Sequence, residues 1–195
     1  MSKTFLSMIL LSAVLNIDLG AEPISPLERQ RLTSHLDMTQ RWLIDQVSNL
    51  SPAQLNFRPA TGSWTVLEVL DHLVVVAPIY WQDLQDALKT PGGQTSPSTD
   101  ADILWYGIDR THREQAIPTE VPKGLRDLRG GLDEYRKLHA RLREYISTTK
   151  DDLRGHIVAR QRCDAYQWAL LISTHEQRHI LQIRDIKADP KFPRK

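Results

Sequence analysis

Near the end of the chain, the pentapeptide His175-Glu176-Gln177-Arg178-His179 places two histidines four residues apart. On an α-helix such residues point within about 40° of each other and lie about 6 Å apart along the axis. Both imidazoles can therefore reach one metal ion. The letters also match the H-E-x-x-H pattern of zinc proteases, in which the glutamate is the general base. The question is which kind of helical metal site this is.

The residues after the second histidine exclude the protease interpretation. No His or Glu comes after His179, and the longer metzincin pattern needs a glycine and a histidine where this chain has Gln182 and Asp185. Without the glycine the helix continues and carries Asp185 about 9 Å further along the axis, too far for shared coordination. Glu176 is left as a weak candidate for a general base, and we expect its side chain to face solvent.

A third ligand is needed for an open zinc-type site, and His72 is the best candidate. It shares one face of a predicted helix with Val69 and Val76, so it can point inward. His175 and His179 lie within an apolar stripe of their own helix, formed by Trp168, Leu171, Ile172, Ile183 and Ile186. Buried imidazoles need polar partners. The spacing permits a metal site at His72, His175 and His179, with hydrogen-bonded core histidines as the alternative.

The remaining polar residues near these positions are weaker candidates. Gln182 lies one turn beyond His179 on the same face, so we expect it, with Trp168, to contact the ligands or a substrate. Glu68 and Asp71 flank His72, where either could orient an imidazole, but we expect both at the surface. The other histidines lack a spaced partner or lie in polar stretches: His35, His112, His139 and His156.

The elements that must position these residues are helices. Apolar residues recur at helical spacing in four long segments, and almost no alternating strand pattern is present. These segments cover residues 26–50, 65–89, 124–148 and about 164–187. Thr65 and Glu68 predict a capping box, and Pro78 should kink or break the second helix. Four such helices predict an all-α, antiparallel four-helix bundle.

Composition narrows the class of protein. The 195 residues are 41% hydrophobic with a net charge of +1, which allows one domain with a proper core. Neither a basic surface nor a Gly-rich phosphate loop is present, so we expect no nucleic-acid partner. The only cysteine, Cys163, cannot form an internal disulfide, and we expect it to be buried near a helix start.

The N-terminus resembles a secretory signal. Lys3 is followed by an apolar stretch from Thr4 to Leu15, which is shorter than the roughly 20 residues of a membrane span. Ala21 offers a small residue for cleavage. The pattern predicts a signal peptide over residues 1–21, a domain over residues 22–195, and an exported protein without a stable membrane anchor. The alternative is an apolar N-terminal helix that stays on a cytoplasmic protein.

Two stretches, residues 62–76 and 166–183, resemble the DinB-like superfamily of four-helix proteins. In that family a Trp-Ser/Thr pair begins a helix with one histidine, and the last helix carries H-x-x-x-H followed by Gln-Ile. The corresponding positions here are Trp64, Thr65, His72, His175, His179, Gln182 and Ile183. The resemblance implies a divalent ion, zinc or nickel, on the three histidines, a small-molecule substrate and a homodimer.

The family resemblance leaves three functions open. Characterised relatives transfer a small thiol to an electrophile, with the metal activating the thiolate. Export argues against that chemistry, because reduced thiol cofactors are chiefly cytosolic. A hydrolase that uses metal-activated water fits export better. The third possibility is a metal-binding protein without catalysis.

Overall fold

The four predicted helices form, and each begins where the sequence supplies a cap. The computed structural model describes residues 23–194 except 61, 113 and 125–126, so the predicted signal peptide lies outside the described residues. Helices α1 (Pro26–Val47), α3 (Val66–Ala87) and α6 (Ala165–Lys187) all start with a capping box. Thr65 and Glu68 form the predicted one, and α3 continues through Pro78. Helix α5 (Leu128–Thr148) starts at the N-cap Asp127.

Shorter elements complete the chain, and the sequence patterns do not predict them. Helix α2 (Pro52–Leu55) lies in the connection after α1, and α4 (Asp100–Tyr106) covers one side of α6. Strands β1 (Ile157–Val158) and β2 (Cys163–Asp164) pair antiparallel as a small ribbon before α6. None of the helices in the described part of the chain combines the length and apolar character of a membrane span.

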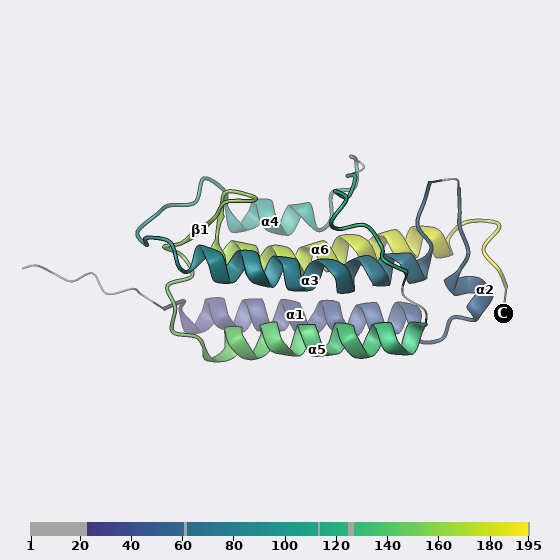
Figure 1. Ribbon diagram of the computed structural model, residues 1–195, viewed down its shortest axis with the longest axis horizontal. Helices are drawn as coiled ribbons and strands as arrows, with labels where there is room; N and C mark the ends of the chain where they lie inside the picture. Colours follow the sequence, from purple (N-terminus) through teal and green to yellow (C-terminus); the bar gives the residue numbers. More distant parts are fainter. Residues whose placement is uncertain (1–22, 61, 113, 125–126, 195) are drawn as a thin grey trace, which may run out of the picture.

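The long helices pack as a square, with α1 against α5 and α6, and α3 against α5 and α6 (Figure 1). Helix α1 runs parallel to α6, since His35 contacts Ser173 and Gln46 contacts Lys187. Helix α3 runs antiparallel to α6, and α1 runs antiparallel to α5. Two helices therefore run in each direction, which is an all-α four-helix bundle as predicted.

The core consists of two apolar clusters with a polar belt between them. One cluster includes Trp168 and Leu171 of α6, and the other includes Ile180 and Ile183. Between them α6 buries five polar side chains, namely Ser173, Thr174, His175, Glu176 and Arg178. Burial of so many polar groups is costly unless each has a partner. In this belt, buried polar side chains interrupt the apolar core, and the belt includes residues of the pentapeptide.

Candidate metal centre

Three histidines from two antiparallel helices meet in this belt. His72 of α3 and His175 of α6 are buried, and His179, one turn further along α6, is half-buried. Their ligand atoms all lie within 4.8 Å of one another. In the described part of the chain, no other group of three or more His, Cys, Asp or Glu side chains meets this condition.

The separations of the ring nitrogens suit a metal ion. Nε2 of His175 lies 3.3 Å from Nε2 of His72 and 3.1 Å from Nε2 of His179. Two nitrogens bound tetrahedrally to zinc at about 2.0–2.1 Å would be about 3.3–3.4 Å apart. These two separations are therefore nearly those that a shared ion requires, and the three rings can hold one metal ion.

The outer nitrogens of two rings fix which nitrogen carries the proton. Nδ1 of His72 is 2.6 Å from the backbone oxygen of Glu120, and a carbonyl only accepts, so Nδ1 must donate. Nδ1 of His179 likewise donates to Oε1 of Gln182, at 2.8 Å. In each neutral ring the proton is then on Nδ1, which leaves a lone pair on Nε2. Both lone pairs point toward His175.

Burial keeps these rings uncharged. Desolvation is the main cause that lowers the pKa of His72 and of His175 below the ordinary value, and it lowers the pKa of His179 to about 3. The neighbouring rings and the Arg178 guanidinium lower the pKa of His175 and His179 further. A metal ligand must be neutral imidazole, so the surroundings favour ligation rather than protonation.

Aromatic rings surround the three histidines. The indole of Trp64 lies 4.8 Å from the ring of His72 and stacks 6.1 Å from that of His179, measured between centroids. Tyr80 lies 5.4 Å from His175. Trp168, expected near the ligands, lies behind Tyr80, with its Nε1 donating to the Tyr80 carbonyl. Trp64 and Tyr80 are thus the aromatic neighbours of the site, while Trp168 supports one of them.

The expectation that Glu176 faces solvent is wrong. Its side chain is only 9% exposed, and its Oε2 accepts hydrogen bonds from Thr39 Oγ1 at 2.9 Å and Tyr135 Oη at 3.0 Å. Nε2 of His139 lies 3.6 Å away. A helical wheel places Glu176 to one side of the histidines, but it does not show that α1 and α5 cover that side. Burial raises the pKa of this carboxyl, and the hydroxyls and His139 oppose the rise.

Asp71 also differs from expectation, because it is buried rather than at the surface. Its Oδ2 accepts from the backbone N–H of Gly124 at 2.6 Å. The expected surface role holds better for Glu68, which caps α3 and pairs with Arg58. Asp71 therefore ties α3 to the same loop whose carbonyl binds His72.

The structure also shows a role for Arg178 that its place in the pentapeptide does not reveal. It is 9% exposed, and its guanidinium donates to the backbone oxygens of Tyr106, Asp109 and His112. Gly107 lies so close to α6 that a Cβ there would be 2.9 Å from the Cβ of Thr174. Arg178 thus fastens the segment after α4 onto α6, and no residue pattern predicts contacts made by backbone carbonyls.

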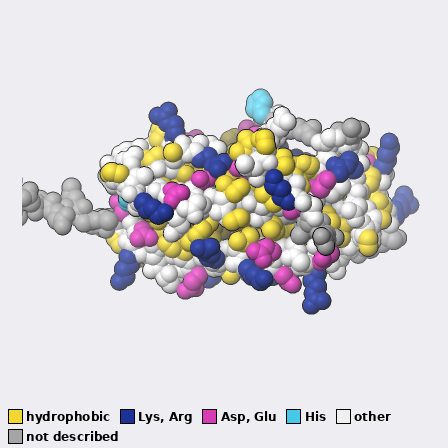
Figure 2. Space-filling view, in the orientation of Figure 1, with side chains coloured by type: hydrophobic (Ala, Val, Ile, Leu, Met, Phe, Trp, Pro, Cys, Tyr) yellow, Lys and Arg dark blue, Asp and Glu magenta, His cyan; other side chains and the backbone are white. Residues whose placement is uncertain are grey.

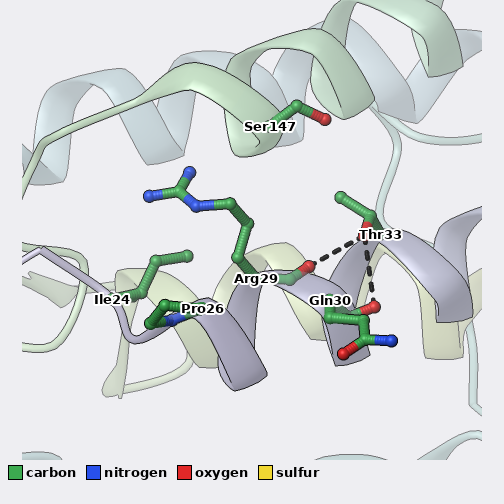
Figure 3. Close-up of a pocket in the computed structure, with 6 residues that line it drawn as sticks. All are labelled: Ile24, Pro26, Arg29, Gln30, Thr33 and Ser147. Carbon is green, nitrogen blue, oxygen red and sulfur yellow. Dashed lines mark hydrogen bonds between the residues drawn. The ribbon is translucent and has the colours of Figure 1, made fainter.

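Two pockets lie away from the three histidines. A surface pocket of about 390 Å³ lies between the start of α1 and the end of α5 (Figure 3). Its Arg29 donates to the Ile146 and Thr149 carbonyls, and its Thr33 hydroxyl bonds to the α1 backbone, so these polar groups are engaged. A cavity of about 30 Å³ between α3 and α5 reaches His139 and Glu176. Apolar side chains are visible over these two helices (Figure 2).

Comparison with known proteins agrees with this architecture. A family model described as the DinB superfamily matches residues 35–183. The chain is 25% identical over 150 residues to the protein YuaE of Bacillus subtilis (strain 168). The aligned region covers 73% of this chain and 89% of YuaE.

A solved structure shares the fold. It is YfiT from Bacillus subtilis, described as a probable metal-dependent hydrolase with an unusual four-helix bundle topology. The TM-score is 0.58 at 19% sequence identity, over 84% of this chain and 88% of YfiT. Together with the match of the family model over most of the chain, the four-helix bundle gives one conclusion: this chain belongs to the DinB superfamily.

Proposed function

We propose that this protein is a metal-dependent hydrolase of small molecules, with a divalent ion, zinc or nickel, held by His72, His175 and His179. The observation that carries the proposal is the convergence of three Nε2 atoms at separations of 3.1 and 3.3 Å from the central one. When bound, such an ion supplies a Lewis acid that lowers the pKa of a coordinated water.

The protein's own groups prepare the site for that ion. Glu120 and Gln182 hold two rings with Nε2 directed inward, and burial keeps all three rings neutral. His179 is the most exposed of the three ligands, so the side of His179, beside Gln182 and Trp64, is where a substrate would approach. We assign no general-base role to Glu176, because its carboxylate already accepts from two buried hydroxyls.

A thiol transferase is the second candidate, and hydrolysis is favoured for two reasons. The similar structure of YfiT is described as that of a probable metal-dependent hydrolase, and the N-terminal pattern predicts export, where reduced thiols are scarce. The protein's own thiol does not alter this preference. Cys163 is buried, and burial, helped by Asp164, raises its pKa to about 12, so the thiolate is rare at neutral pH.

The decisive experiment is elemental analysis of the purified protein beside His72→Ala and His179→Ala. We expect one equivalent of metal in the parent and little in either variant. His112→Ala is the matched control, because it removes an exposed imidazole and leaves the three rings intact. A parent that stays metal-free after incubation with zinc or nickel would make the histidines structural and overturn the proposal.

Activity then separates the three functions. A hydrolase should cleave activated esters or amides without added thiol and lose that activity in His175→Ala. A thiol transferase should instead bind a small thiol saturably when metal is present. A protein that holds metal and does neither is a passive binder, and the hydrolase proposal would be wrong.

A further inference from the structure

One loop connects the metal centre to the rest of the fold. The backbone oxygen of Glu120, in the loop of residues 117–124, accepts the 2.6 Å hydrogen bond from Nδ1 of His72. This contact sets the tautomer of His72 and aims its Nε2 at His175. The Glu120 carbonyl thus supports the orientation of the ring that ligation needs.

The side chain of Glu120 is held as well. Its Oε1 accepts from Nη1 of Arg160 at 2.8 Å, and the Glu120 side chain is only 10% exposed. Within the loop, the N–H of Glu120 donates to the Ile117 carbonyl at 2.9 Å, and the N–H of Gly124 donates to Asp71. Arg160 thus binds the side chain of Glu120, while His72 of α3 binds its backbone oxygen.

Arg160 has two carboxylate partners on different parts of the fold. It lies in the turn between β1 and β2, and its Nε donates to Oδ2 of Asp83 on α3 at 2.6 Å. The same guanidinium therefore joins α3, which carries His72, to the loop that holds the His72 ring. A guanidinium offers several donors in a fixed plane, whereas a lysine ammonium cannot reproduce that fork.

We propose that Arg160 is a positioning residue of the metal centre: it latches Glu120 so that the loop carbonyl keeps His72 in the ligating orientation. This inference rests on the proposed metal function. Removal of a direct outer partner of a metal ligand typically lowers affinity about 10- to 100-fold. Arg160 acts one contact further away, so we expect about a three- to tenfold loss of zinc affinity on its removal.

The test compares Arg160→Gln, Arg160→Lys, Glu120→Ala and the double variant Arg160→Gln/Glu120→Ala in the full chain. The first readout is the dissociation constant for zinc, measured against a competing chelator. The second is the exchange with water of the His72 Nδ1 proton, followed by NMR in the metal-free protein and assigned by its loss in His72→Ala. Both readouts depend on the fraction of molecules in which the Glu120 carbonyl is in place.

Arg143→Gln is the matched control. It removes another arginine with a carboxylate partner, since Arg143 binds Asp37 through Nε at 2.5 Å and Nη2 at 3.0 Å, but on the α1–α5 side of the bundle. We expect Arg160→Gln to weaken zinc binding and to speed proton exchange, with partial recovery in Arg160→Lys. The double variant should be no worse than the worse single variant, because both break one latch.

The proposed role of Arg160 is wrong if Arg160→Gln leaves exchange of the His72 proton within about twofold of the parent. It is also wrong if Arg143→Gln weakens zinc binding and speeds this exchange as much as Arg160→Gln does. It is also overturned if the two single effects add in the double variant. Failure of the metal function is recognised separately. A parent that binds no zinc refutes that function, while the His72 proton in the metal-free protein still decides whether Arg160 positions the ring.

Discussion

His175 and Glu176 are neighbours in the chain, yet they serve two different polar regions on α6. His175 faces α3, where it meets His72, and it also meets His179 one turn further along its own helix. Glu176 faces α1 and α5, where it meets Thr39, Tyr135 and His139. We call the first region the histidine triad (His72, His175 and His179) and the second the Glu176 cluster (Thr39, Tyr135, His139 and Glu176).

The two regions differ in their balance of donors and acceptors. In the triad, Glu120 and Gln182 accept hydrogen bonds from the Nδ1–H groups of His72 and His179, and the Nε2 lone pairs of these rings are directed at His175. In the Glu176 cluster, two hydroxyls already donate to the carboxylate. A cation would complete the triad, whereas the carboxylate has its donors within the protein. Burial of polar side chains alone therefore does not identify a metal site.

The largest effect that distinguishes the regions should be stabilisation by metal. A ligand present at 1,000 times its dissociation constant stabilises the native state by about 4.1 kcal/mol. We expect zinc to raise the free energy of unfolding by about this amount in the parent and in Glu176→Gln, but not in His175→Ala. Denaturant titrations with zinc and with chelator measure it, each variant serving as its own reference. If zinc no longer stabilised Glu176→Gln, the Glu176 cluster and the triad would have to form one metal site.

Removal of the carboxylate should be the next largest effect, this time on the metal-free protein. Glu176→Ala leaves the buried Tyr135 hydroxyl without the acceptor it now has, which should lower the free energy of unfolding by about 2–3 kcal/mol. Glu176→Gln keeps an acceptor and should cost about 1 kcal/mol or less. Chemical unfolding in chelator gives both values. Equal costs for the two variants would show that the hydrogen bonds contribute little.

Gln182 offers a smaller effect confined to the triad. Gln182→Ala removes the acceptor for Nδ1 of His179, and we expect zinc affinity to fall about tenfold, or about 1.4 kcal/mol. Gln182→Glu keeps an acceptor and should retain most of the affinity. Gln177→Ala is the control on the same helix, because Gln177 is a hydrogen-bond partner of His35 instead. A similar loss in Gln177→Ala would mean that α6 responds as a whole rather than at the triad.

Sequence patterns predict more of the triad than of the Glu176 cluster, for a physical reason. His175 and His179 are related by one helical turn, so their shared direction follows from the helix itself. His72 follows from the apolar face of its own helix, and the resemblance to the family agrees with it. The partners of Glu176 come from α1 and α5, and helical periodicity says nothing about how separate helices align. His139 has no spaced partner on its own helix and so no pattern singles it out, yet it packs within 3.6 Å of Glu176.

In the fold, too, local features can be predicted from the sequence, whereas contacts between separate elements cannot. The capping box predicts the start of α3, and apolar spacing predicts the segments of α1 and α6, because those signals are local. Strands of two residues are too short to give an alternating pattern, so periodicity does not predict β1 and β2. The link between His72 and Glu120 uses a backbone carbonyl, which every residue has. No residue type could therefore have marked that loop in the sequence.

The smallest effect concerns a single hydroxyl of the Glu176 cluster. Tyr135→Phe removes one of the two hydrogen bonds to the carboxylate without changing the shape of the ring, so it should lower the free energy of unfolding by about 1 kcal/mol. Tyr145→Phe is the matched control, since that hydroxyl binds the exposed carboxylate of Asp151 at 2.6 Å and water can replace it. We expect the control to cost less, and zinc affinity to stay within about twofold of the parent in both variants. Tyr135 binds Glu176, which directly follows His175 on α6. A change in zinc affinity in Tyr135→Phe alone would therefore mean that the Glu176 cluster sets the position of the triad, and that the two regions act as one site.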